Sequence, residues 1–147
     1  MKKTMLILRG CSGAGKTTYA TRLMKKISGM FGVKCVKCSA DDFFLKSGTY
    51  QFDPRNLKKA HDECKAKTNK AARDSTDLII IDNTSTQIWE MEPYIFIAKD
   101  RGYRVVFRTI GHMDEDSLKL YASRNEHGVP KEAIDRMAKR FEPNPKM

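Results

Sequence analysis

One stretch near the N-terminus, residues 5–18, constrains the fold more than any other part of the chain. An apolar run leads into a glycine-rich turn that opens into a helical pattern, and the core of the turn reads G-x-x-x-x-G-K-T. Glycines let the backbone approach an anion closely, and the N–H groups of a helix start point toward it. The stretch therefore predicts a phosphate-binding loop that contacts ATP, rather than an ordinary glycine-rich turn. Its expected ATP-binding residues are Gly10, Ser12, Gly13, Ala14, Gly15, Lys16, Thr17 and Thr18.

Two side chains of this phosphate loop carry specific chemistry. Lys16 would place its charge on the β- and γ-phosphates of the nucleotide, and the hydroxyl of Thr17 is a candidate ligand for Mg²⁺. ATP, or another nucleoside triphosphate, and Mg²⁺ are therefore the expected cofactors.

Apolar runs that alternate with helical patterns follow the loop. The expected strands are residues 4–9, 33–38, 77–82 and 103–110, which makes a parallel sheet with helices on both faces. The prediction is an α/β, three-layer P-loop NTPase fold with four to five strands. We expect one domain over residues 1–147, with a C-terminal helical lid at about 112–141. Pro93 is expected to restart a helix, and the proline-rich tail from Glu142 is expected to fray.

Acidic and polar side chains stand where two of these strands end. Ligands of parallel sheets lie beyond the carboxyl ends of the strands, so these residues should gather beside the phosphate loop. Asp82 is predicted to position Mg²⁺, with an Asx turn as the alternative. Asp41 and Asp42 are adjacent, so one should face an acceptor while the other braces or caps the loop. The expected acceptor-binding residues are Asp41, Asp82, Asn83 and Thr84.

The lid supplies the cations expected over the transferred phosphoryl group. Arg124 is the first candidate, because an arginine fork stabilises charge on the β- and γ-phosphates. Arg136 and Arg140 are second choices. His127 precedes Gly128 at a helix end, where a cationic side chain more often satisfies helix carbonyls than takes part in chemistry.

The charge balance indicates the kind of partner. The 147 residues carry 28 Lys and Arg against 18 Asp and Glu, a net charge of +10. Such a field attracts polyanions such as nucleic acid, nucleotides or anionic membrane, although solubility alone is an alternative explanation. A basic helical stretch over residues 58–73 is a candidate track for a polyanion. The N-terminal apolar run is too short for a signal peptide or membrane span, which predicts an intracellular, cytoplasmic protein with no membrane partner.

Five motifs in this order resemble the phage-type 5′-hydroxyl polynucleotide kinases: the phosphate loop, D-D after the second strand, I-I-D-N-T at the third, W-E-M-x-P-Y in the next helix and R-N-x-x-G in the last quarter. The resemblance implies transfer from ATP to a nucleic acid with a 5′-OH end, and so a role in nucleic-acid repair. It implies Asp41 as general base and Lys16 and Arg124 as catalytic cations. Two positions depart from the family pattern: Phe44 and His127 stand where the phage enzymes have arginines.

Two other functions fit the same residues. A small-molecule kinase acting on a nucleoside, nucleotide or sugar would use the same loops, although a neutral acceptor needs no strongly basic field. A non-catalytic ATP-gated module that binds nucleic acid would need no acid at the position of Asp41. The sequence identifies no protein partner and does not distinguish DNA from RNA.

Overall fold

A four-stranded parallel sheet forms the centre of the computed structural model, which describes residues 2–30 and 32–147. The strands are β1 (Thr4–Arg9), β2 (Cys35–Cys38), β3 (Leu78–Asp82) and β4 (Arg104–Thr109), in the order β2-β3-β1-β4. The helices are α1 (Lys16–Ser28), α2 (Leu57–Arg73), α3 (Ile88–Asp100), α4 (Glu115–Arg124) and α5 (Lys131–Lys139). Two short 3₁₀ helices, η1 (Ala40–Leu45) and η2 (Pro54–Asn56), lie between β2 and α2.

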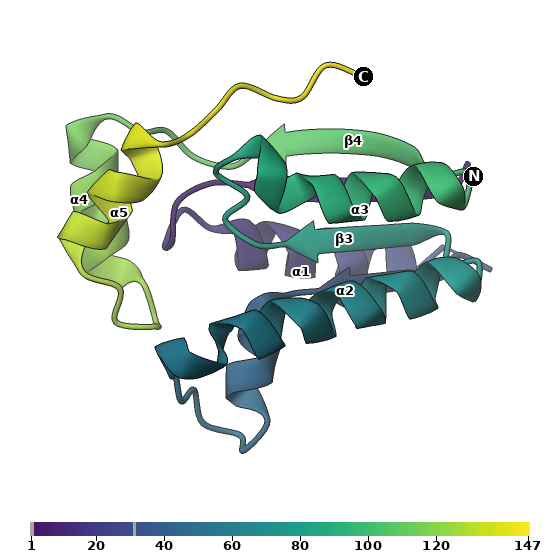
Figure 1. Ribbon diagram of the computed structural model, residues 1–147, viewed down its shortest axis with the longest axis horizontal. Coiled ribbons are helices and arrows are strands. Elements are labelled where there is room, and N and C mark those ends of the chain that lie inside the picture. The colour runs from purple at the N-terminus through teal and green to yellow at the C-terminus, as the bar shows by residue number, and fades with distance from the viewer. Residues whose placement is uncertain (1, 31) are drawn as a thin grey trace.

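The two central strands, β1 and β3, are buried throughout, which explains why they are continuous apolar runs. In β1, Met5 and Ile7 point to the face that packs against α2 and α3, whereas Leu6 and Leu8 point to the face covered by α1. Figure 1 shows α2 and α3 on one side of the strands and α1 on the other. The predicted three-layer P-loop NTPase fold is therefore confirmed, with four strands in the described part of the chain.

Helices α4 and α5 form a separate pair beside the end of the sheet at which the strands finish (Figure 1). They pack on the phosphate loop itself through a small apolar cluster that includes Cys11, Ala14, Leu118, Tyr121 and Ile134. The segment predicted to be a lid therefore contains a helical pair that touches the loop, and its action as a lid stays a prediction. Cys11 is buried in this cluster and is therefore a core residue, and its burial raises the pKa of its thiol.

The prediction that Pro93 restarts a helix is wrong, because α3 runs continuously through it. Gln87 and Glu90 form a capping box at the start of the helix, and burial of Met91 and Tyr94 holds the turns on either side of the proline. These contacts outweigh the one backbone hydrogen bond that a proline at the sixth helical position removes.

The prediction that the tail frays from Glu142 is also wrong. The backbone N–H of Glu142 donates to the carbonyl of Thr86 at 2.8 Å, and the Glu142 side chain accepts from the N–H of Ile88 at 2.9 Å. The guanidinium of Arg9, which is 0% exposed, donates to the Glu142 carbonyl and to the Asn144 side chain. Burial lowers the pKa of Arg9, and Glu142 and Glu90 oppose that shift. The tail is therefore anchored to the end of β1.

The described residues contain no helix that is both long and apolar enough to cross a lipid bilayer.

Candidate functional site

The phosphate loop has the backbone conformation that its glycines predicted. Gly10 and Gly13 adopt φ of 150° and 84°, in the region that favours glycine. A Cβ at Gly10 would lie 2.6 Å from the carbonyl oxygen of Ile110, and one at Gly13 would lie 2.5 Å from that of Tyr121. These two glycines are therefore required both by the turn and by the close approach of β4 and α4.

Lys16 is buried at the start of α1, and its ammonium donates to the carbonyl of Cys11 at 3.1 Å. Burial lowers the pKa of Lys16, whereas Asp82, Cys11 and Asp41 act in the opposite direction. The predicted phosphate cation is thus within electrostatic range of both predicted site carboxylates.

Thr17 and Asp82 are brought together by the end of β3 and the start of α1. The Thr17 hydroxyl donates to Asp82 Oδ2 at 2.8 Å, and Asp82 is only 4% exposed. A hydroxyl and a carboxylate are the oxygen donors that suit Mg²⁺, which usually keeps waters and phosphate oxygens as its other ligands. No group of three or more His, Cys, Asp or Glu side chains in residues 2–30 and 32–147 forms a protein-only metal site.

Lys37 was missed by the sequence reasoning. It lies on β2, next to β3, and its ammonium is 4.0 Å from Asp82 Oδ2. The sequence offers little indication of this role, because a lysine at the next-to-last position of a strand is usually solvated.

Asn83 and Thr84 lie at the same edge but are engaged with the protein. The Asn83 side chain accepts from the N–H of Ala40 at 2.9 Å and donates to Cys64 Sγ at 3.7 Å. The carbonyl of Thr84 accepts from the N–H of Gly10 at 3.0 Å. Both residues connect β3 to neighbouring loops, and acceptor binding by them stays a prediction.

Asp41 lies in η1 with its side chain 49% exposed, and two aromatic residues contact its two oxygens. The Tyr50 hydroxyl donates to Oδ1 at 3.3 Å, and Nδ1 of His127 is 3.4 Å from Oδ2. The two rings stack with centroids 3.8 Å apart and planes 8° apart. Burial, followed by the charge of Asp41, raises the pKa of Tyr50 to about 12, so the phenol remains a hydrogen-bond donor at neutral pH. We call Asp41, Tyr50 and His127 the carboxylate clamp.

The neighbouring acid, Asp42, turns toward α2, where Lys67 Nζ is 3.9 Å from Oδ2. The N-cap of η1 is Ser39, whose hydroxyl accepts from the N–H of Asp41 at 3.3 Å. Neither acid is therefore needed as a cap. Phe44, at a position of departure from the phage pattern, is 4% exposed and packs in the core.

Arg124 extends from the end of α4 to the phosphate loop. Its Nε donates to the carbonyl of Gly13 at 2.8 Å, and an Nη donates to that of Ala14 at 3.4 Å. The guanidinium also lies over the ring of Tyr121, 5.3 Å from the centroid. The predicted lid arginine is thus beside the loop.

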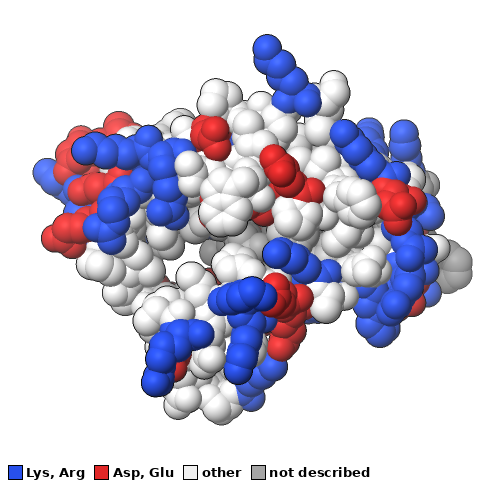
Figure 2. Space-filling model, viewed as in Figure 1, with Lys and Arg blue, Asp and Glu red and all other residues white. Residues whose placement is uncertain are grey.

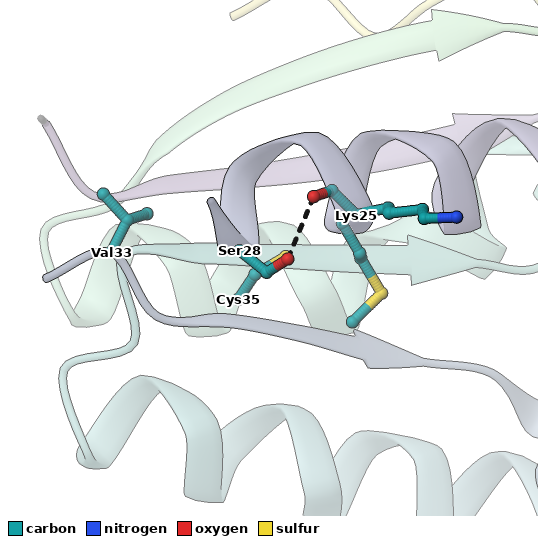
Figure 3. Close-up of a pocket in the computed structure, with 5 residues that line it drawn as sticks. Lys25, Ser28, Val33 and Cys35 are labelled. Carbon is teal, nitrogen blue, oxygen red and sulfur yellow. Dashed lines mark hydrogen bonds between the residues drawn. The ribbon is translucent and has the colours of Figure 1, made fainter. Parts of the chain in front are cut away.

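A surface hollow elsewhere has no comparable chemistry. It lies between the end of α1 and the start of β2 and is lined by Met24, Lys25, Ser28, Val33 and Cys35. In Figure 3 the Ser28 hydroxyl bonds to the Lys25 carbonyl, and the Lys25 side chain extends along α1 away from Val33. Lys25 is the one charged lining residue, so the hollow offers no acid–base pair.

Comparison with known proteins identifies the family. The model of the AAA domain family matches residues 5–144. The chain belongs to this family. It is 37% identical over 138 residues to NEDD4-binding protein 2 of Homo sapiens, a match that covers 94% of this chain and 8% of that protein. The chain thus spans a small part of the length of this curated relative.

Solved structures share the fold of this AAA domain at low sequence identity. A structure of the Pnkp1/Rnl/Hen1 RNA repair complex matches with a TM-score of 0.72 and 21% identity, over 95% of this chain and 44% of that one. Chaetomium thermophilum Kti12 in complex with ADP-AlF3 matches with a TM-score of 0.66 and 15% identity, over 96% and 82%. These structures show that the chain has the P-loop NTPase fold, and the family match is to the AAA domain family rather than to the phage-type polynucleotide kinases that the motifs resemble.

Proposed function

We propose that this AAA domain transfers the γ-phosphate of ATP to the 5′-hydroxyl end of a nucleic acid. The observation that carries the proposal is the carboxylate clamp, because it holds an exposed acid by contacts to both of its oxygens, and its His127 lies three residues after Arg124, which contacts the phosphate loop. A pure ATPase or a nucleotide switch needs no such acid. The likeness of the fold to a chain of an RNA repair complex also supports a nucleic-acid acceptor.

The donor side is assigned to the phosphate loop and its cations. Lys16 would leave the Cys11 carbonyl and place its charge on the β- and γ-phosphates, while the guanidinium of Arg124, already on the loop, would turn its free N–H groups toward the same oxygens. Thr17 and Asp82 would hold Mg²⁺, which neutralises charge on the phosphate oxygens when it is bound.

The acceptor side is assigned to Asp41. Its carboxylate would accept a hydrogen bond from the acceptor hydroxyl and orient it in line with the γ-phosphorus. As the new phosphorus–oxygen bond forms, the bond to the bridging oxygen of ADP breaks, and the hydroxyl proton passes to Asp41.

A transfer screen tests the proposal. Purified protein, γ-labelled ATP and Mg²⁺ are incubated with 5′-OH DNA and RNA oligonucleotides, or with a panel of nucleosides and sugars. We expect label only on the oligonucleotides, none on their 5′-phosphorylated counterparts, and loss of labelling when EDTA removes the metal. Absence of label from every oligonucleotide would contradict the proposal.

A small-molecule kinase is the second candidate, and the distribution of charge favours it. Over residues 112–141 the positive and negative side chains balance, so the lid adds no basic field for a polymer. The cations are Lys119, Arg124, Lys131, Arg136, Lys139 and Arg140, and the acids are Asp114, Glu115, Asp116, Glu126, Glu132 and Asp135. Label on a nucleoside or sugar in the screen, with none on oligonucleotides, would select this function.

His127 is expected to act as a positioning residue through Asp41. We expect His127→Ala to lower kcat by about 10- to 100-fold, because small misplacements of a reacting group have effects of that size. The KM for ATP should change little, since the interactions of His127 seen among the described residues are with Asp41 and Tyr50. In an Asp41→Asn background the same substitution should cause no further loss. Steady-state kinetics of the two single variants and the double variant measure this, with exposed Glu126→Ala as control. An equal loss in both backgrounds would show that His127 acts independently of Asp41.

A further inference from the structure

The excess positive charge of the chain gathers at the end of the sheet where the strands begin, opposite the phosphate loop. We call this region the basic end and define it by eight residues at strand starts and helix C-termini. They are Lys2, Lys3, Lys34, Lys70, Arg73, Lys99, Arg101 and Arg104. Three acids, Asp74, Asp77 and Asp100, lie among them, which leaves an excess of five charges out of the net +10. Figure 2 shows the blue side chains dominating the right of the view, whereas blue and red mix over the lid on the left.

Backbone pairing places these cations across the width of the sheet. The N–H of Leu78 donates to the carbonyl of Lys34, that of Thr4 to Asp77, and that of Arg104 to Lys3. Neighbouring strands of a sheet lie about 4.8 Å apart. Lys34 precedes β2 and Arg104 starts β4, and these strands are at opposite edges of the sheet, so the two backbones are about 14 Å apart. At 3.4 Å per base pair, that row is about as wide as four base pairs of duplex.

Helix dipoles explain only part of the basic end. Lys70, Arg73 and Lys99 lie in the last turns of α2 and α3, where cations stabilise the helix C-terminus. Lys3 lies over the ring of Tyr103, 5.4 Å from its centroid, and so has a packing role. Lys34, Arg101 and Arg104 are all exposed. Arg101 is the C-cap of α3, with its Nε 3.9 Å from Asp100 Oδ2, whereas Lys34 and Arg104 lie at strand starts, where neither explanation covers them.

The basic stretch of α2 nearer the site is weaker than its sequence indicates. Lys58 pairs with Asp62 at 2.8 Å, and Lys46 pairs with Glu63 at 2.7 Å. These pairs reduce the field that the N-terminal half of α2 would offer to a polyanion.

We propose that the basic end binds the phosphate backbone of a nucleic acid, at a surface separate from the candidate active site. Two of these cations make ion pairs, Lys70 with Asp74 at 2.9 Å and Arg101 with Asp100 at 3.9 Å. A row of lysine and arginine heads across a sheet edge, in excess over the acids among them, suits sequence-independent phosphate contacts. A bilayer is disfavoured as the partner, because α1, α2 and α3 meet this edge by their C-termini and not by a side that could lie along a membrane surface. The inference does not depend on kinase activity.

The test measures binding without any possible transfer. The probe is a fluorescein-labelled 20-base-pair duplex with phosphate on both 5′ ends, in the absence of ATP. The variant Lys34→Gln/Arg101→Gln/Arg104→Gln is compared with Arg22→Gln/Lys119→Gln/Lys146→Gln, which removes the same charge at exposed positions elsewhere. Thermal melts by circular dichroism check that both variants are folded.

For three lost phosphate contacts, the slope of log K against log salt should fall in magnitude by about 2.7, and affinity at 0.15 M salt should drop on the order of 100-fold. The affinity of the control variant for the duplex should fall by less than about threefold, because it loses the same net charge but no direct phosphate contact. Failure of the wild-type protein to bind, or equal losses in the two variants, would overturn the proposal. So would a loss of binding to phosphatidylserine vesicles by the basic-end variant with unchanged duplex affinity.

Discussion

Asp41→Asn is expected to slow phosphoryl transfer by about 10²- to 10⁴-fold, while the affinity for ATP stays within about twofold of the wild-type value. The amide keeps the shape of the side chain and still accepts from Tyr50, so the carboxylate clamp and η1 should remain folded. The amide takes no proton from an alcohol, and loss of a general base costs about 10²- to 10⁴-fold in rate. Single-turnover transfer from γ-labelled ATP to a 5′-OH oligonucleotide, or to whichever acceptor the screen identifies, measures the loss. Nucleotide affinity is measured separately by titration calorimetry.

The adjacent acid provides a matched control. Asp42→Asn makes the same chemical change one residue later, where the carboxylate faces Lys67 on α2. We expect a rate within about threefold of wild type, because that ion pair is exposed and weak. Turnover by the Asp41 variant at the wild-type rate, or equal losses in the two variants, would remove Asp41 from the mechanism.

The parts of the site that the sequence predicted are those fixed by local chemistry or by strand topology. The phosphate loop is contiguous, so its glycines and Lys16 could be assigned from spacing alone. Asp82 and Thr17 are 65 residues apart, yet parallel strands end at one edge, and their hydrogen bond follows from that rule. Arg124 was placed near the loop by the expectation of a lid, and its contact with Gly13 agrees with that expectation.

The residues that sequence reasoning missed depend on packing between distant segments. The contact of His127 with Asp41 joins a segment after α4 to η1, far apart in the sequence, and Gly128, with φ of 67°, follows His127 directly. Tyr50 lies in a loop with no periodicity, where an aromatic residue is usually assigned to the core. The location of the positive charge could not be predicted either. The sequence gives the net charge of +10, but where the cations gather depends on which strand ends and helix ends lie together in the fold.

Arg9→Met is expected to destabilise the fold by about 3–5 kcal/mol, the cost of removing one partner from a buried charged network. The guanidinium donates to Ser85 at 2.8 Å, Thr86 at 3.1 Å, Glu142 at 2.7 Å and Asn144 at 2.7 Å, and it stacks over Phe141 at 4.3 Å. Methionine fills part of the volume but leaves these acceptors without their donor. For a chain of this size, the melting temperature should fall by roughly 10 °C or more, as measured by calorimetry.

Arg22, an exposed residue on α1, provides the control. Arg22→Met makes the same substitution at a side chain that forms no hydrogen bond or ion pair with the residues that the structure describes. It should alter stability by less than about 0.5 kcal/mol. Removing residues 141–147 should lower the stability by part of the loss expected for Arg9→Met. Adding Arg9→Met to that truncated protein should then lower the stability by less than it does in the full chain, because the two changes remove the same contacts. Additive losses would mean that Arg9 stabilises the loop after β3 without the tail. Non-additive losses would mean that the tail, through Arg9, holds Ser85 and Thr86 in place directly behind the Asp82 end of β3.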